Sequence, residues 1–152
     1  MGDFEQEIRQ NIFKNDRLKA LLNVMYTANW IRDNHTHIFK EYKILQQHYN
    51  VLRIVRGRNG KEVTPGEIIK VMLDKGRDLT RLVDKLVKIG YLERSQDVKN
   101  RRKVNILLTE KGLKITDEIE ERLSDWITSK IKMSEEETKA LNLLLDQMRK
   151  VD

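Results

Sequence analysis

Three cations recur at four-residue intervals in the middle of the chain, namely Arg77, Arg81 and Lys85. On an α-helix they would share one face, because residues four apart are neighbours on the helix surface. An arginine guanidinium can donate two parallel hydrogen bonds to O6 and N7 of guanine, and a lysine ammonium can contact phosphate or base. Such a face can enter the major groove of a nucleic acid. The alternative is ordinary surface patterning of Arg81 with Asp84 or Lys85, and of Arg77 with Asp78.

A second cluster of cations lies between two predicted strands. Residues 104–108 alternate as a β-strand does, and the partner strand is predicted to begin at 91–94. The loop between them carries one acid and four cations: Asp97, Lys99, Arg101, Arg102 and Lys103. Because the narrow minor groove attracts Lys and Arg, a basic hairpin tip can enter it while a neighbouring helix occupies the major groove. We interpret Asp97 as a brace for an arginine of this loop.

Two short helices would position these cations. Residues 64–67 (TPGE) predict a helix start in which Thr64 is the N-cap and Glu67 reaches back to it. This helix is expected to stop near Lys75. The next helix is predicted over residues 75–89, and its apolar residues at i, i+3, i+4 and i+7 are Leu79, Leu82, Val83 and Leu86. Two short helices of which the second is basic indicate a helix-turn-helix.

Further helices are predicted before this pair. Residues 4–40 favour one long helix or two in succession, with a break near Asn15 where Asp16 can act as a cap. Another helix is predicted from about 44 to 56, with His48 at the edge of its buried face. The residues of that helix predicted to face inward are Leu45, Tyr49, Leu52 and Val55.

Two apolar helices are predicted after the hairpin. Thr109 caps the first, and Ser134 opens the second with a capping box. The stripe of the first helix comprises Ile115, Ile119, Leu123, Trp126, Ile127 and Ile131. The residues of the second predicted to face inward are Leu141, Leu144, Leu145 and Met148. The first of these helices is more apolar than a small domain needs, so together with residues 4–40 it can form a dimer interface, with internal packing as the alternative.

The distribution of charge supports binding to a polyanion. The chain has 152 residues and a formal net charge of +6, with 36% charged residues, one proline and no cysteine. Residues 43–112 hold 17 Lys and Arg against 8 Asp and Glu, whereas residues 1–42 are balanced and residues 113–152 are acidic. The absence of cysteine excludes disulfides and thiolate metal sites. No apolar run approaches a membrane span, so we expect a cytoplasmic protein with no membrane partner.

Aromatic and histidine side chains form the remaining candidate site. Tyr26, Trp30, His35 and His37 could line a cavity, although residues at helical spacing more often form core or a subunit interface. Two histidines at i, i+2 do not share a helix face, so we predict no metal site and no cofactor. No nucleophile, base and orienting group occur in a recognisable pattern, and we do not expect an enzyme.

Taken together, these segments resemble the MarR family of winged helix-turn-helix transcriptional regulators. Members of that family commonly carry T-R-L-V-D-R-L, then G-L-V, a D-x-R-D-x-R wing and L-T-x-x-G. This chain has TRLVDKL at 80–86, GYL at 90–92, DVKNRR at 97–102 and LTEKG at 108–112. The resemblance in helix order extends over nearly the whole chain, and its specific motif lies within residues 79–112.

The resemblance implies a mainly α fold with a small two- or three-stranded antiparallel β-wing and with N- and C-terminal dimerisation helices. It implies one MarR-like unit over 1–152, in which about 43–112 form the winged helix and about 1–42 and 113–152 form the dimerisation part. The helix at 75–89 would read the major groove. The residues that we predict to bind DNA are Lys75, Arg77, Thr80, Arg81, Lys85, Lys99, Arg101 and Arg102.

Two residues of the wing depart from the family pattern. Lys99 stands where the family usually has the arginine that enters the minor groove, and it lacks the planar, weakly hydrated guanidinium. Asn100 replaces an aspartate, which makes this wing more basic. Arg102 stands where an arginine of the family ties the wing to the acid at Asp97.

The resemblance also implies partners. The chain would be a homodimeric regulator, with repression as the expected role, that binds double-stranded DNA and loses affinity when a small aromatic molecule binds between the dimer region and the winged part. Residues that could line such a pocket are Tyr26, Trp30, His48 and Tyr49. The alternative is a winged-helix module that docks a protein or RNA without recognising an operator.

Overall fold

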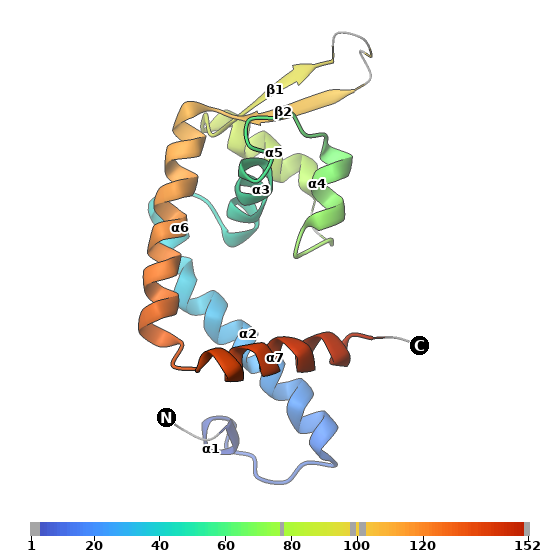
Figure 1. The fold of residues 1–152 in the computed structure, drawn as a ribbon, viewed down its shortest axis with the longest axis vertical. Helices are drawn as coiled ribbons and strands as arrows, with labels where there is room; N and C mark the ends of the chain where they lie inside the picture. The colour runs from blue at the N-terminus through green and yellow to red at the C-terminus, as the bar shows by residue number, and fades with distance from the viewer. Residues whose placement is uncertain (1–3, 77, 98–99, 101–102, 151–152) are drawn as a thin grey trace. The chain divides into compact units, whose positions relative to one another are not determined.

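The computed structural model of the protein describes residues 4–76, 78–97, 100 and 103–150, and within that part it is mainly α with one β-hairpin, as predicted (Figure 1). Its elements, in chain order, are α1 (Phe4–Ile8), α2 (Asp16–Glu41), α3 (Gln46–Arg56), α4 (Pro65–Val71), α5 (Leu79–Lys88), β1 (Leu92–Gln96), β2 (Val104–Leu108), α6 (Glu110–Lys130) and α7 (Glu135–Met148).

The chain forms two compact units that divide after Asp117, within α6. The first unit contains α1 to α5, the hairpin and the start of α6, and the second contains the rest of α6 and α7. The predicted grouping of residues 1–42 with 113–152 concerns an assembly of two chains, and it stays a prediction.

The break in the N-terminal helical region is confirmed, but its cap differs from the prediction. Asn15 is the N-cap of α2, and its side chain accepts a hydrogen bond from the backbone N–H of Leu18 at 2.9 Å. Asp16 is instead the first helical residue, where its negative charge faces the positive end of the helix dipole. Phe4 of α1 packs edge-on against Tyr26 of α2, with ring centroids 5.8 Å apart.

Helix α3 starts two residues later than predicted, and the expected burial of Leu45 is wrong. Leu45 is the N-cap, has no side-chain acceptor and is 53% exposed. Its backbone N–H donates to Nδ1 of His48 at 3.1 Å, so the imidazole ring caps the helix start. His48 is buried, together with Tyr49, Leu52 and Val55, and does not lie at the edge of the apolar face.

The first helix of the predicted pair begins as expected. Thr64 accepts from the backbone N–H of Glu67 at 3.3 Å, and Glu67 accepts in return from the Thr64 backbone N–H at 2.9 Å. The Thr64 backbone N–H and then the Thr64 hydroxyl, which both donate to the Glu67 carboxylate, lower the pKa of Glu67. The helix ends at Val71, earlier than predicted, and of its apolar residues Ile68 is buried while Leu73, just beyond it, is 79% exposed.

The hairpin pairs two antiparallel strands beside these helices. Leu92 lies opposite Leu108, and Gln96 lies opposite Val104. An isolated bridge between Val63 and Ile106 adds the backbone before α4 to the edge of β2. Figure 1 shows α3, α4 and α5 gathered on one side of this hairpin, and their shared core includes Leu52, Ile68, Leu86, Leu92 and Ile106, all at most 2% exposed.

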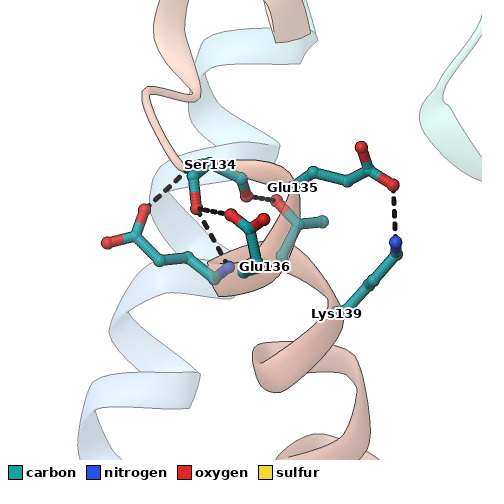
Figure 2. Close-up of polar contacts among 6 residues, drawn as sticks. Ser134, Glu135, Glu136 and Lys139 are labelled. Carbon is teal, nitrogen blue, oxygen red and sulfur yellow. Dashed lines mark hydrogen bonds and ion pairs between the residues drawn. The ribbon is translucent and has the colours of Figure 1, made fainter.

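The C-terminal helices have the predicted caps, but α7 does not bury its apolar residues within the chain. Thr109 accepts from the backbone N–H of Gly112 at 2.9 Å. Ser134 forms a capping box with Glu137, and Figure 2 shows the Glu136 carboxylate beside the Ser134 hydroxyl. Most apolar residues of α7 are exposed, namely Leu141, Leu143, Leu144 and Met148, with exposed fractions between 41% and 61%. The prediction that Leu141, Leu144 and Met148 face inward is therefore wrong for the single chain.

Candidate nucleic-acid interface

Helix α5 separates an apolar face from a charged one. Leu79, Val83 and Leu86 are buried, and Leu82 is half-buried. The side chains on the other side form what we call the exposed α5 face: Thr80, Arg81, Asp84, Lys85 and Lys88. Because four of these five side chains can donate hydrogen bonds and three are cations, the face suits contacts with phosphate and with base edges.

Arg81 is held at the start of α5 by the residue that caps the helix. Asp78 is the N-cap, and its Oδ1 accepts from the backbone N–H of Arg81 at 3.3 Å. Its Oδ2 lies 3.1 Å from Nε of Arg81, whose side chain is nevertheless 88% exposed. The guanidinium is thus oriented by Asp78 while most of its donors face solvent.

Two predicted contact residues lie before the helix. The prediction that a helix begins at Lys75 is wrong, because α5 begins at Leu79. The residue before it, Asp78, has an extended backbone and is the N-cap of the helix. Lys75 is an exposed residue of the preceding turn, in which Asp74 accepts from the Gly76 backbone N–H at 3.2 Å. Arg77 lies outside the described residues.

The base of the wing is ordered by Asp97 and its neighbours. Asp97 Oδ1 accepts from the backbone N–H of Asn100 at 2.8 Å. The Asp97 backbone N–H donates to the Lys103 carbonyl at 3.0 Å, and the Lys103 N–H donates to the Asn100 carbonyl at 2.8 Å. Asp97 therefore stabilises the turn through the backbone. Its predicted partner Arg102, together with Lys99 and Arg101, lies outside the described residues, so the predicted brace stays a prediction.

The C-terminal end of α5 is fastened to two other helices of the first unit. The Tyr91 hydroxyl donates to the carbonyl of Tyr42, which ends α2, at 3.2 Å. Lys111 Nζ donates to the Ile89 carbonyl at 3.0 Å, and the Thr109 hydroxyl donates to the Gly90 carbonyl at 2.6 Å. The orientation of the exposed α5 face is thereby tied to α2 and α6.

Sequence reasoning missed some of the residues that support this face. Tyr91 was assigned only to a strand, and Arg94 was given no role, although it forms an ion pair with Asp84 of α5. A tyrosine directly after the glycine that ends a basic helix is a usable signal for a fastening residue. The Arg94–Asp84 pair has no local sequence signal, because the two residues belong to different elements.

The predicted pocket residues occupy different environments. Tyr26 contacts Phe4, and both Tyr26 and Trp30 are 38% exposed. His48 and Tyr49 are buried in α3, and the Tyr49 ring lies 5.5 Å from that of Phe39. The hollows that we describe in the first unit are lined by other residues, the largest of about 370 Å³ by Val55, Lys61, Leu107 and Leu113 among others. The pocket therefore stays a prediction.

Burial makes the two described core histidines weaker bases. The pKa of His48 is lowered by burial and then by the positive charge of Lys85 in α5. The pKa of His35 is lowered by burial and then by His37. Both rings therefore favour the neutral form. For His48, one of the causes is the charge of Lys85, which belongs to the exposed α5 face.

The described residues contain no cluster of three or more His, Asp or Glu side chains that could hold a metal ion. Within the same ranges no helix combines the length and the apolar character that crossing a bilayer requires. The prediction that no metal is bound is not tested further by these observations.

The chain has a short helix, a second helix with an exposed basic face and a hairpin beside that helix. This arrangement defines a winged helix-turn-helix protein. The chain is similar to the MarR family of such transcriptional regulators, whose sequence model matches residues 44–104. It is 29% identical over 115 residues to the HTH-type transcriptional regulator PecS of Dickeya dadantii, covering 74% of this chain and 69% of PecS.

Two solved structures share the fold over almost the whole chain. One is a mutant MarR from E. coli complexed with operator DNA, with a TM-score of 0.71, 24% identity and coverage of 98% of this chain and 100% of that one. The other is the organohalide-sensing transcriptional regulator RdhR in its 2,4-dichlorophenol-bound form, with a TM-score of 0.77 and 19% identity, covering 98% of this chain and 85% of that one.

Proposed function

We propose that this chain is a sequence-specific regulator that binds double-stranded DNA as a homodimer and represses transcription from the bound site. The observation that carries the proposal is the exposed α5 face, on which Thr80, Arg81 and Lys85 stand beside the hairpin. The structural relative from E. coli binds operator DNA, which supports the same ligand for this fold. Arg81 would read bases, because its guanidinium is both oriented and exposed.

A dimer is supported by apolar side chains that the single chain leaves in solvent. In α7 these are Leu141, Leu143, Leu144 and Met148, and in α2 they include Leu18, Leu21, Val24 and Met25. Exposed apolar side chains gathered along a helix are typical of a protein interface. Two copies related by a twofold axis would present two α5 helices to a palindromic site.

Release by a small aromatic ligand is the regulatory part of the proposal. RdhR is known in a 2,4-dichlorophenol-bound form, which supports a phenolic ligand for a fold of this kind. The candidate lining remains Tyr26, Trp30, His48 and Tyr49. A ligand that prefers a geometry with displaced α5 helices would weaken DNA binding by its difference in affinity for the two geometries.

The proposal is tested by Arg81→Ala, with Arg149→Ala as a matched control. Both arginines form an ion pair with the aspartate three residues earlier in the chain, each at one end of a helix, and both changes remove one positive charge. The probe is a duplex enriched by the wild-type protein from a random-sequence pool, compared with a shuffled duplex of equal length. Arg81→Ala should reduce the preference for the enriched duplex by roughly 5-fold to 100-fold, the range of about 1–3 kcal/mol for a base contact, and Arg149→Ala should leave it unchanged.

A change in the wing separates general attraction from base recognition. Lys99→Ala should weaken binding to both duplexes equally and reduce the slope of log affinity against log salt by about 1. If neither Arg81→Ala nor Lys99→Ala affects binding, the assignment of the DNA-binding surface is wrong. Wild-type binding to RNA or protein in preference to DNA would favour the alternative of a docking module.

A further inference from the structure

The exposed α5 face carries one carboxylate among its cations. Asp84 lies between Arg81 and Lys85 along the helix, and 55% of its side chain is exposed. A negative charge at this place opposes the approach of phosphates, whose attraction to cations provides most of the general affinity for DNA. A contact within the chain can explain a carboxylate at this position.

That contact is Arg94 of β1, which donates through its Nη2 atom to Oδ1 of Asp84. Arg94 shares a strand face with Leu92, since alternate residues of a strand point to the same side. Leu92 is 2% exposed, so this is the face of β1 that covers the core. Arg94 thus reaches from the core side of the hairpin to the outer face of the helix, with its side chain 38% exposed.

Arg94 also lines a hollow between the helix and the hairpin. This hollow, of about 210 Å³, lies between α5, the start of α4 and the two strands. Its lining includes Thr80, Val83, Arg94, Val104 and Ile106. Side chains that interlock fix the angle between two elements, but a hollow leaves that angle dependent on the contacts around its rim.

Resting on the proposed function, we infer that Asp84 and Arg94 are positioning residues that hold α5 and the wing at one angle, so that both can occupy their grooves together. The pair raises sequence preference without touching a base. Asp84 reduces general attraction to DNA, and in exchange it fixes the geometry in which Arg81 meets its base.

This inference is tested by measuring affinities for an enriched and a shuffled duplex. Three proteins are compared: wild type, Asp84→Asn, and a double variant in which the charges are exchanged, Asp84→Arg with Arg94→Asp. The duplexes are those obtained with the wild-type protein from a random pool. Asp84→Asn should bind the shuffled duplex more tightly, because a negative charge is lost. The ratio of the affinities for the enriched and the shuffled duplex should fall by up to about fivefold, which corresponds to the coupling energy of an exposed ion pair. The double variant should recover that ratio.

Asp117→Asn is the matched control. It removes a carboxylate from an Asp–Arg pair of similar exposure, 49% and 40%, that joins α6 to α3. It should leave the ratio between the duplexes unchanged, and unfolding midpoints of all variants report whether each one folds.

The outcomes separate this inference from the proposed function. If wild type shows no preference for the enriched duplex, the proposed function fails and the inference fails with it. If wild type has a preference and Asp84→Asn keeps it in full, only the inference is overturned. If Asp84→Asn loses the preference and the charge swap does not restore it, Arg94 or Asp84 contacts DNA directly and the positioning role is wrong.

Discussion

Single carboxylates determine how the cations of α5 are presented. Asp78 orients Arg81 by accepting from its backbone N–H and by forming an ion pair with its guanidinium, whereas Asp84 forms an ion pair with Arg94 of the hairpin. The sequence suggested Asp84 as the neighbour that pairs with Arg81, whereas the partner in the structure is Asp78. The sequence does not reveal the Asp84–Arg94 contact, because it depends on the angle at which the hairpin crosses the helix.

His48 makes stability depend on pH. Burial and the charge of Lys85 lower its pKa in the folded state, and Nδ1 accepts from the Leu45 backbone N–H. The unfolded chain therefore binds the proton more readily, so this contribution to the free energy of unfolding is complete above about pH 6.5 and is lost as pH falls below that value toward the lowered pKa of the folded state.

The test compares wild type with His48→Gln in urea unfolding at pH 7.5 and pH 5. A glutamine at this position can still accept from Leu45 but does not titrate. We expect the wild type to lose more stability than the variant over this interval, with a slope of at most about 1.4 kcal/mol per pH unit for one proton. Equal losses in the two proteins would show that His48 does not contribute.

At the scale of elements, the boundaries follow local hydrogen bonds. The capping boxes at Thr64 and Ser134 were predictable because donor and acceptor lie three residues apart in the sequence. The start of α3 was not, because Leu45 has no side-chain acceptor and the cap comes from the ring of His48. The same holds for the Tyr91–Tyr42 contact, whose partners are separated by 49 residues.

The start of α6 requires a glycine where it crosses the turn between α5 and β1. A Cβ atom at Gly112 would lie 1.9 Å from the carbonyl oxygen of Tyr91, a backbone atom that no rotamer change can move away. Gly112→Ala should therefore destabilise the protein by about 1–3 kcal/mol and displace the end of α5. The measurement is the free energy of unfolding by urea.

Gly66→Ala is the control for this change. Gly66 lies in α4, and a Cβ atom there would meet nothing within 4 Å. The substitution should be neutral or stabilise by up to about 1 kcal/mol, because alanine loses less backbone entropy on folding. Equal effects at Gly66 and Gly112 would contradict the close approach of α6 to Tyr91.

In the whole molecule, the terminal helices are the elements whose apolar side chains the single chain leaves exposed. The sequence predicted their helical spans from apolar periodicity, and these spans are confirmed at Glu110–Lys130 and Glu135–Met148. Periodicity shows which residues share a face, but it cannot distinguish a face covered by the same chain from one covered by another chain. That ambiguity explains why Leu144 was expected inside and is 61% exposed.

Sedimentation velocity at micromolar concentration tests the dimer. We expect wild type to sediment as a dimer and Leu144→Arg to raise the dissociation constant at least about fivefold, since an apolar anchor of an interface contributes more than about 1 kcal/mol. Leu73→Arg is the control, because Leu73 is still more exposed, at 79%, but follows α4 in the DNA-binding part. A monomeric wild type, or the same change in both variants, would contradict the dimer.

We propose that the exposed α5 face gives this chain a preference for one DNA sequence. This preference is tested by the affinity of the wild-type protein for the enriched and the shuffled duplex, measured over a series of salt concentrations. We expect log affinity to fall linearly with log salt for both duplexes, and the enriched duplex to bind at least roughly 10³-fold more tightly throughout. Equal affinity for the two duplexes at every salt concentration would contradict it.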